Sequence, residues 1–468
     1  MKHLLILILL ASNLVWCQIT PQQMVSTMGR GINIGNVLSA PIEGNWAPAL
    51  EQTYLQDIAQ VGFTTVRIPM DFFGDRTSGD TSVYSKNAGT ANSYTGSPSD
   101  YMVSPTYLDR VEEVLNWALN ENLIVILDFH GATLKEEFLY TFSPKPQHAD
   151  FYTAPTSAKR QADNEKFRAV WTAISNRLKD YPYNLVFEIV NEPYFFLTAA
   201  EMDNLNTDII NIIRASGSNN ANRNIIITGG SQNSFEAPLQ IGSSVLSSDN
   251  HLIATFHYYL PADFTKSSQV DFNDFDWGTP ADKAQVDADF ETVANWASNN
   301  NTPVLLGEFG ADNEGGYDYS TNTYGDFGGP DPDSRAEYYG YLGQKAIDLG
   351  FAFTAWDAGH KSNKTIYLQP TRTWVDNVKT ALLPEALSIK NTLVSEINVL
   401  PNPNNGSFKI SSKNPILEAI LFDAQGKTIK LTKSVDNHFY SCGISKGLYI
   451  LKLKTEQNQY INKKIIVN

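Results

Sequence analysis

The stretch LVFEIVNEP (residues 185–193) places a short apolar run directly before two polar residues. Apolar side chains dominate its first six positions, which is typical of a strand that is buried on both faces of a parallel sheet. Asn191 and Glu192 follow where this strand would end. The stretch therefore predicts a buried strand that presents an amide and a carboxylate at one edge of a sheet.

The same pattern recurs along the chain, and longer amphipathic segments separate the repeats. The clearest of these segments, YLDRVEEVLNWALNEN (107–122), places Val111, Val114 and Leu115 on one helical face. We expect further helices at 163–180, 199–216, 282–299 and 334–349. The eight expected strands are Gly31–Asn36, Thr64–Ile68, Leu123–His130, Leu185–Asn191, Asn224–Thr228, His251–His257, Pro303–Glu308 and Phe351–Trp356.

Eight buried strands that alternate with helices predict an α/β fold, either a (β/α)8 TIM barrel or an open doubly wound sheet. The open sheet is disfavoured because no strand is followed by a glycine-rich phosphate loop. The barrel is favoured because polar residues follow strand after strand, at ends that converge on one face of a barrel. These residues are Asn36, Arg67, His130, Asn191, Glu192, His257, Glu308 and Trp356.

The composition excludes some classes of ligand. The chain has 468 residues and a formal net charge of −15, and it is 18% charged and 12% aromatic. An acidic chain is a poor partner for nucleic acids, whose phosphates need a basic face, and for anionic membrane surfaces. Many aromatic rings and few charges suit uncharged, ring-shaped ligands better.

The first seventeen residues have the features of a signal peptide, because Lys2 precedes an apolar run that is too short to span a membrane. Cleavage after Cys17 would leave Cys442 as the only cysteine. This count excludes an intrachain disulfide and a Cys–His zinc site. We expect an exported protein with no membrane span in its mature form.

Glu192 and Glu308 each stand where a buried strand ends, and an unpaired carboxylate there would cost desolvation energy. Two carboxylates that face one barrel mouth suit glycoside hydrolysis, in which one protonates the leaving oxygen and the other attacks the sugar. The alternative is that each is a structural acid bridged to Arg67 or to a histidine. The mechanism needs no metal or cofactor, and we expect none.

Residues 28–385 resemble glycoside hydrolase family 5, the cellulase family of retaining (β/α)8 glycosidases. The motifs occur in the family's order: GINIGN (31–36), VRIP (66–69), VILDFH (125–130), FEIVNEP (187–193), HYY (257–259), LLGEFG (305–310) and FTAW (353–356). The resemblance implies that Glu192 is the acid/base and Glu308 the nucleophile of a secreted enzyme that cleaves β-glucan. Among β-glucanases, we expect an endo-β-1,4-glucanase.

The resemblance also implies roles for the residues around the two glutamates. Asn191 would bind the sugar 2-hydroxyl, while Arg67 and Tyr259 would hold and orient Glu308. His257 would bond near Glu192, His130 would line the site, and Trp356 would form the floor under the sugar. From its place at a strand end, Asn36 is a further substrate-binding or supporting candidate. Candidate aromatics for additional sugar subsites, with local packing as the alternative, are Trp46, Tyr258 and Trp277.

One departure from the family leaves the substrate open. Many endoglucanases of the family have two consecutive histidines after the third strand, whereas Gly131 follows His130 here. A His–Gly pair occurs in relatives that act on β-1,3-glucans. A β-1,3- or mixed-linkage glucanase and a β-mannanase are therefore alternatives. A non-catalytic glycan-binding barrel is an alternative of another class, although the intact pair of glutamates opposes it.

Three long loops and one acidic stretch lie between these motifs. The loops at 73–104, 131–160 and 260–281 would line a cleft and would decide between endo and exo action. The spacing of Asp312, Asp318, Asp331 and Asp333 in the acidic stretch 311–334 does not match an EF-hand calcium loop. We expect this stretch to be a solvated loop rather than a calcium site.

From residue 396 the chain changes to short alternating strands separated by Asn-Gly, Gly-Lys and Lys-Gly turns. This segment has ten Lys, no Arg and five acidic residues, whereas residues 1–395 have a net charge of −20. We therefore expect a barrel domain at 18–385, a linker at 386–395 and a small β-sandwich at 396–468.

Four motifs of the sandwich, VLPNPNNGSF, LFDAQGKTI, KGLYILKL and KKIIVN, resemble the type IX secretion sorting domain of Bacteroidetes proteins. The resemblance implies a secreted or cell-surface protein that the secretion machinery carries across the outer membrane. A carbohydrate-binding sandwich is the alternative. The expected partners are a polysaccharide or oligosaccharide substrate and the secretion machinery, and we expect a monomer.

Overall fold

A computed structural model of the chain describes residues 19–84, 93–131, 158–193, 198–271, 274–384 and most of 397–467. The expected signal peptide and linker lie outside these residues, as do parts of the three long loops. The chain divides into two compact units, Met1–Leu383 and Pro384–Asn468.

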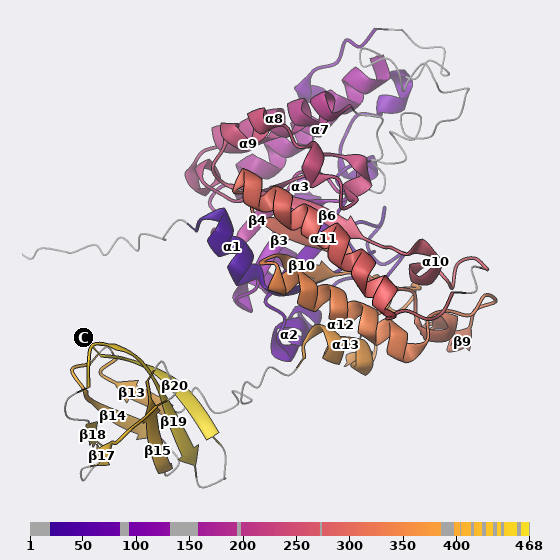
Figure 1. The fold of residues 1–468 in the computed structure, drawn as a ribbon. Coiled ribbons are helices and arrows are strands. Elements are labelled where there is room, and N and C mark those ends of the chain that lie inside the picture. Colours follow the sequence, from indigo (N-terminus) through magenta and orange to yellow (C-terminus); the bar gives the residue numbers. More distant parts are fainter. Residues whose placement is uncertain are drawn as a thin grey trace, which may run out of the picture. The chain divides into compact units, whose positions relative to one another are not determined.

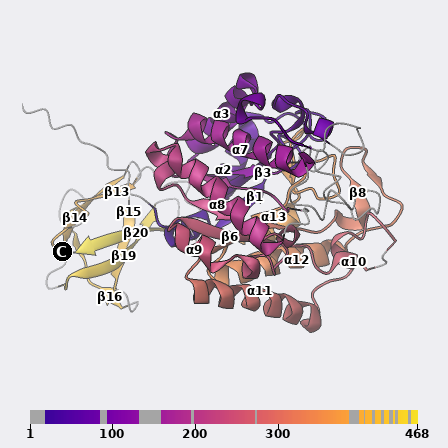
Figure 2. The same ribbon diagram turned by 90° about the horizontal axis from the view of Figure 1, so that it is seen from above.

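The first unit is a closed barrel of eight parallel strands with helices around it (Figures 1 and 2). The strands are β1 (Arg30–Asn33), β2 (Thr65–Met70), β3 (Ile124–Phe129), β4 (Leu185–Glu188), β5 (Ile225–Ile227), β6 (Leu252–Tyr258), β7 (Val304–Phe309) and β10 (Ala352–Ala355). The predicted (β/α)8 barrel is thus confirmed.

Strand β1 closes the barrel because it pairs with both β2 and β10, and Gly31 lies opposite Thr65 and Thr354. A Cβ atom on Gly31 would approach the Thr354 side chain to 2.7 Å, so only glycine fits this closure. Three predicted strand ends are wrong by two or three residues. Strand β1 stops at Asn33, so Asn36 lies beyond it, and β4 stops at Glu188, so Glu192 lies on the following loop. Strand β2 continues to Met70, so Arg67 lies inside the strand.

The helices that surround or cap the barrel bury mainly apolar faces. Helix α3, for example, buries the side of its surface that contains Val111, Val114 and Leu115, as predicted. Helix α1 packs Met24 and Met28 against the first residues of β3 and the neighbouring strands. The helices are α1 (Pro21–Met28), α2 (Gln52–Val61), α3 (Pro105–Asn120), α7 (Ala158–Leu178), α8 (Ala199–Ala215), α9 (Ser243–Ser248), α10 (Ala262–Thr265), α11 (Pro280–Asn300), α12 (Pro332–Asp348) and α13 (Asp376–Leu382).

Two short hairpins extend the loops after the last barrel strands. The first hairpin, β8 (Tyr317–Asp318) with β9 (Thr323–Tyr324), lies between β7 and α12. The second, β11 (Tyr367–Leu368) with β12 (Thr373–Trp374), lies between β10 and α13. Within the described part of the chain, no helix combines the length and the apolar character needed to cross a membrane.

The second unit consists of two four-stranded antiparallel sheets, ordered β13-β14-β18-β17 and β16-β15-β19-β20. Phe408, Leu421, Leu451 and Ile465 belong to its separate core. The strands are β13 (Ile397–Leu400), β14 (Ser407–Ser412), β15 (Ile416–Phe422), β16 (Thr428–Ile429), β17 (Thr432–Lys433), β18 (His438–Tyr440), β19 (Gly447–Thr455) and β20 (Tyr460–Val467). The predicted small β-sandwich is confirmed.

Candidate active site

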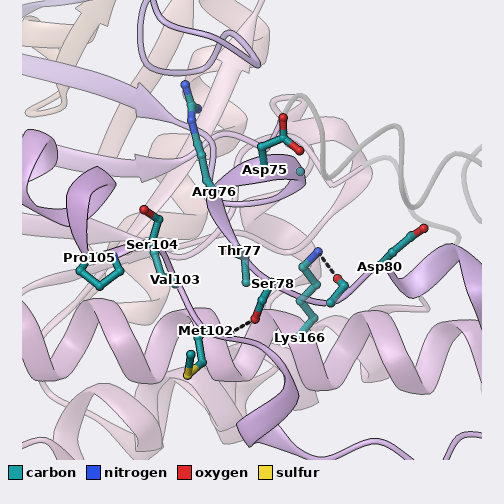
Figure 3. Close-up of a pocket in the computed structure, with 12 residues that line it drawn as sticks. Asp75, Arg76, Thr77, Ser78, Asp80, Met102, Val103, Ser104, Pro105 and Lys166 are labelled. Carbon is teal, nitrogen blue, oxygen red and sulfur yellow. Dashed lines mark hydrogen bonds between the residues drawn. The ribbon is translucent and has the colours of Figure 1, made fainter.

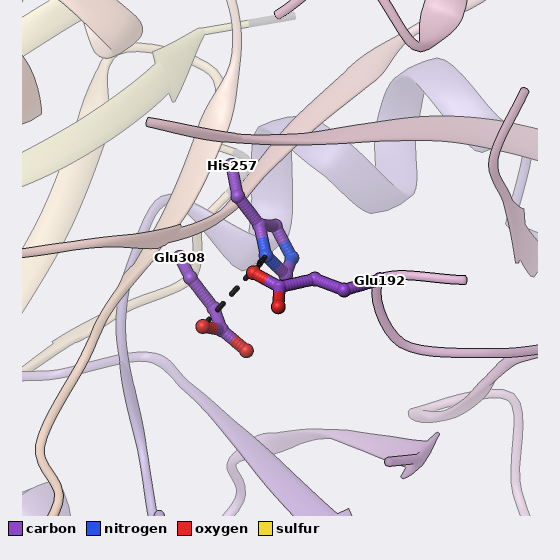
Figure 4. Close-up of side chains that lie close together, drawn as sticks. All are labelled: Glu192, His257 and Glu308. Carbon is purple, nitrogen blue, oxygen red and sulfur yellow. Dashed lines mark hydrogen bonds and ion pairs between the residues drawn. The ribbon is translucent and has the colours of Figure 1, made fainter. Parts of the chain in front are cut away.

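Glu192, His257 and Glu308 meet at the carboxyl end of the barrel (Figure 4). His257 is in β6 and Glu308 is in β7, while Glu192 follows β4. His257 Nδ1 lies 2.8 Å from Glu192 Oε1 and 3.7 Å from Glu308 Oε2. One carboxylate oxygen of each glutamate and a nitrogen of His257 all lie within 4.8 Å of one another. The barrel therefore brings together the two glutamates that the sequence singled out.

Both oxygens of Glu308 accept a hydrogen bond from a neighbouring side chain. Arg67 Nη1 donates to Oε1 at 2.7 Å, and the Tyr259 hydroxyl donates to Oε2 at 2.9 Å. The Glu308 side chain is only 5% exposed. Two donors on two oxygens hold the carboxylate in one orientation and compensate its charge in a buried place.

Glu192 has different surroundings. Its side chain is 15% exposed, three times the exposed fraction of Glu308, and its backbone has a φ of 33°. Burial alone would lower the pKa of His257, but the carboxylates of Glu308 and Glu192 outweigh it and raise this pKa. The contact between His257 Nδ1 and Glu192 Oε1 couples the protonation of the imidazole to that of this carboxyl group.

Arg67 is the charge centre below the two glutamates. It is fully buried, and its Nε and Nη2 atoms bind the two oxygens of Glu188 at 2.6 and 2.9 Å. Nη2 also lies 3.0 Å from Asp128 and 2.8 Å from the Asn191 oxygen, while Nη1 donates to Asn33 at 2.9 Å. Burial opposes its charge, yet Asp128, Glu188 and Glu308 together raise the pKa of Arg67 well above its ordinary value.

Three further residues, for which the sequence predicts no role, surround Arg67: Asn33, Asp128 and Glu188. All three are buried, and Asp128 and Glu188 occupy neighbouring positions of paired strands β3 and β4. Burial, and then the charge of Asp128, raises the pKa of Glu188 although Arg67 opposes the shift. The available signal was an acidic residue within an otherwise apolar strand, where burial requires a partner.

The structure also places the remaining supporting residues. Asn191 Nδ2 is buried and has no hydrogen-bond partner among the described residues, so a donor is free beside the glutamates. His130 bonds to Asp128 at 2.8 Å, and its ring stacks on Trp356 with centroids 5.6 Å apart. Asn36 donates to the carbonyl of Ala358 at 3.1 Å and thereby supports the loop after β10.

Two of the three candidate subsite aromatics are buried in the protein core. Tyr258 is 2% exposed, and its hydroxyl donates to Asp289 at 2.7 Å. Trp277 is 4% exposed and packs against Tyr338. A buried ring cannot stack on a sugar, so these two predictions are wrong. Trp46 is 43% exposed and stays a candidate.

The acidic stretch 311–334 is not uniformly solvated, so this expectation is wrong for Asp312. That side chain is buried, pairs with Lys364, and accepts hydrogen bonds from Ser268 at 2.6 Å and Asn363 at 2.9 Å. Asp331 caps the first turn of α12. These hydrogen bonds tie three loops together around Asp312.

A pocket of about 770 Å³ lies beside the connection between β2 and α3 (Figure 3). Residues 74–80 and 102–105 line it together with Lys166 of α7. Lys166 is buried and donates to the Gly79 carbonyl at 2.9 Å. The lining contains none of the predicted site residues, so this pocket is separate from the glutamate site.

Comparisons with known proteins identify a family for each of the two units. The family model described as Cellulase (glycosyl hydrolase family 5) matches residues 29–362, and the model described as Secretion system C-terminal sorting domain matches residues 398–468. Endoglucanase H of Acetivibrio thermocellus is 30% identical over 78% of the chain, and endoglucanase B of Clostridium cellulovorans is 28% identical over 73%. The chain spans 34% of the first relative and 69% of the second.

The fold is also similar to solved endoglucanases. The crystal structure of an endoglucanase from Thermotoga maritima has a TM-score of 0.60 and 26% identity, and it covers 78% of this chain and 99% of its own. A hyperthermophilic endo-β-1,4-glucanase in complex with substrate has a TM-score of 0.59 and 28% identity, with 78% and 100% covered. The sorting domain marks the protein for export to the cell surface or the medium. With its barrel, its paired glutamates and a family match over most of its length, the chain belongs to glycosyl hydrolase family 5, the cellulase family.

Proposed function

We propose that the barrel is a retaining glycosidase that hydrolyses β-glucan with Glu308 as nucleophile and Glu192 as acid/base. The observation that carries this proposal is the close approach of the two carboxylates: one oxygen of Glu192 lies within 4.8 Å of one oxygen of Glu308. A close approach favours the retaining mechanism, whose carboxyl groups are about 5–5.5 Å apart, over the inverting one, which needs about 6.5–9.5 Å to admit a water molecule.

The surroundings of each glutamate support its assigned role. A nucleophile must be held in one orientation, and Glu308 is held at both oxygens by Arg67 and Tyr259. An acid/base must exchange protons with the leaving group and with water, and Glu192 is the more exposed carboxylate. Its contact with His257 keeps the carboxyl group oriented while its protonation changes.

The proposed reaction has two steps. Glu192 protonates the glycosidic oxygen while Glu308 attacks the anomeric carbon, so the glycosidic bond breaks and a glycosyl-enzyme ester forms. Glu192, now a carboxylate, takes a proton from a water molecule that releases the sugar from Glu308. The free Asn191 amide would donate to the sugar 2-hydroxyl, and Trp356 would support the sugar ring.

The relatives favour a β-1,4-glucan as the substrate. The two relatives are named endoglucanases. Solved structures of the Thermotoga maritima enzyme are described in complex with cellobiose and with mannotriose substrate. The mannotriose complex makes a β-mannanase one competitor, and the His130–Gly131 pair makes a β-1,3- or mixed-linkage glucanase the other. Reducing-sugar release from carboxymethylcellulose, lichenan, laminarin, mannan and xylan tests them, and we expect carboxymethylcellulose to be cleaved fastest. Release from none of the five would favour the non-catalytic glycan-binding alternative.

A pair of variants tests the two roles. Glu192→Ala should lose hydrolysis of natural glycans by about 10²–10⁴-fold, because their leaving groups need a proton. It should keep the first step with an activated aryl β-glycoside, and added azide should restore turnover and yield a β-azide. Glu308→Ala should lose activity toward both substrates, and any azide product should be the α-anomer.

The stereochemistry of these products decides the assignment. A β-azide from Glu308→Ala together with an α-azide from Glu192→Ala would reverse the two roles. Nuclear magnetic resonance can also identify the anomer that the wild-type protein releases first. A product with inverted anomeric configuration would refute the retaining mechanism.

A further inference from the structure

The outer face of sheet β16-β15-β19-β20 in the sorting domain is unusually apolar. Leu448, Ile450 and Ile466 point away from the core, and their exposed fractions are 46%, 40% and 36%. The alternate residues of the same strands, Leu451 and Ile465, are fully buried. Outward positions of a β-sandwich are normally polar, and a contiguous exposed apolar surface marks an interaction site.

The strand register makes these side chains neighbours. Leu448 lies directly opposite Ile466 on β20, and Ile450 lies between Lys464 of β20 and Phe422 of β15. Further along β19, Lys452 pairs with Ile420 and Lys454 with Glu418. The face therefore has an apolar part bordered by lysines, and Glu418 is the acidic residue among these outward positions.

Among its described residues, the other sheet has one exposed apolar side chain, Leu400 of β13, which is 63% exposed and lies opposite Lys409 of β14. On β14 the buried residues Phe408 and Ile410 alternate with Ser407 and Lys409, and Lys409 is exposed. The group of neighbouring exposed apolar side chains that the structure describes therefore lies on sheet β16-β15-β19-β20.

The motif at the start of the sorting domain holds the strand that carries Lys464 and Ile466. Asn402 donates its amide to the Lys464 carbonyl at 2.7 Å and accepts from the Ile466 amide at 2.8 Å. The Asn404 amide donates to the Ile466 carbonyl at 2.9 Å. These bonds occupy the open edge of β20, so a partner that added a strand at this edge would have to displace them. The side-chain face is left for recognition.

We propose that this lysine-bordered apolar face, formed by Leu448, Ile450, Ile466, Phe422 and Lys464, binds a protein component of the export machinery. The partner surface would present an apolar strip beside a carboxylate, because it must cover the exposed Leu and Ile side chains and compensate the charge of Lys464. A protein partner is favoured because the domain matches a secretion system sorting domain. This inference does not depend on the proposed hydrolytic mechanism.

The test uses the full chain, produced in a bacterium that has this secretion system. The variant Leu448→Thr/Ile450→Thr/Lys464→Glu keeps β-forming residues at the apolar positions and reverses one exposed charge. We expect at least a tenfold loss of the protein from the medium and the cell surface, with accumulation in the periplasm. Lys464→Glu alone, which removes no packed atom, should show a smaller loss in the same direction. Lys409→Glu is the matched control, because it reverses an exposed lysine on the other sheet, and it should be exported like the wild type.

Two further measurements keep the outcome decisive. The periplasmic variants should retain the wild-type unfolding midpoint of the sandwich, so that misfolding is not the cause of the loss. Export of the triple variant at the wild-type level would overturn the proposal. Binding of the purified wild-type chain, but not of the triple variant, to vesicles of phosphatidylglycerol would also overturn it, since the face would then recognise an anionic lipid surface.

Discussion

Arg67 connects the candidate nucleophile to charges that lie deeper in the barrel. Its guanidinium contacts Glu308 on one side and forms a two-pronged pair with Glu188 on the other. A fork of this kind fixes the plane of the guanidinium, and lysine could not reproduce it. The position of Glu308 therefore depends on Glu188, which ends β4, whereas the predicted strand Leu185–Asn191 placed it in the strand interior.

Glu188→Gln tests this dependence. The change removes one negative charge from Arg67, so more of the positive charge of Arg67 acts on Glu308. We expect the acid limb of the pH profile of kcat/KM to move to lower pH by up to about one unit. We also expect kcat to fall by about tenfold, because the fork is weakened.

Glu188→Asp is the matched control for charge. It keeps the carboxylate but shortens the side chain, so kcat should fall while the acid limb stays in place. The measurement is the initial rate on an aryl β-glycoside between pH 3.5 and 8. An acid limb that stays in place, or moves to higher pH, in Glu188→Gln would show that Glu188 only supports the fold.

At the scale of elements, the loop after β10 is held by one buried carboxylate. Asp357 follows Trp356 and accepts hydrogen bonds from the amides of Ile366 at 2.7 Å and Tyr367 at 3.3 Å. It also accepts from the hydroxyl of Tyr54 in α2. These bonds connect β10, the β11–β12 hairpin and α2, and they fix the segment that begins at the expected sugar platform.

Asp357→Asn is expected to change how stability depends on pH. Burial raises the pKa of Asp357 to about 6, although its hydrogen bonds act in the opposite direction. A raised pKa stabilises the folded state fully below the unfolded value of about 3.9, and this contribution is lost as the pH rises through 6. The asparagine does not titrate. Between pH 4 and pH 7, the unfolding free energy of the wild type should therefore fall by about 2 kcal/mol relative to that of the variant.

Urea unfolding of both proteins at several pH values between 4 and 7 measures this difference. Asn at this position keeps an oxygen for the two backbone amides and offers its NH2 group to the Tyr54 oxygen, so the fold should be preserved. A difference in unfolding free energy that is constant with pH, or one that favours the wild type as the pH rises, would contradict the assignment.

At the scale of the whole molecule, the chain consists of two units that have separate cores and opposite charge. The barrel core and the sandwich core share no residue, and residues 396–468 are basic whereas the preceding residues are acidic. Separate cores allow each unit to be stable without the other. We therefore propose that the first unit hydrolyses the glycan and that the second unit directs export.

Removal of residues 384–468 tests this division. The shortened chain should retain its activity per folded molecule, because all the site residues belong to the first unit. It should remain in the periplasm of a bacterium with the secretion system. The measurements are reducing-sugar release by the purified protein and its distribution among cell fractions. A folded but inactive truncated barrel would show instead that the second unit supports catalysis.

The sequence by itself determined the order of the eight strands and the two glutamates that define the site. Strand periodicity and strand-end residues are local features, so they can be read without knowledge of distant contacts. Successive side chains of a strand point to opposite faces, and this rule also predicts the place of Tyr258. With His257 and Tyr259 facing the site, Tyr258 must face the helices, where it packs against Phe290.

The tertiary structure alone decided which charges share the barrel interior. Arg67 meets partners that lie 34 residues away at Asn33 and 241 residues away at Glu308. A register shift between β6 and β7 further aligns His257 with Glu308. Helix α7 shows the same limit, because its buried Lys159 donates to the Thr81 hydroxyl, 78 residues earlier in the chain, at 3.0 Å. Burial of a charge depends on a partner from another part of the chain, and only closure of the barrel brings that partner within hydrogen-bond distance.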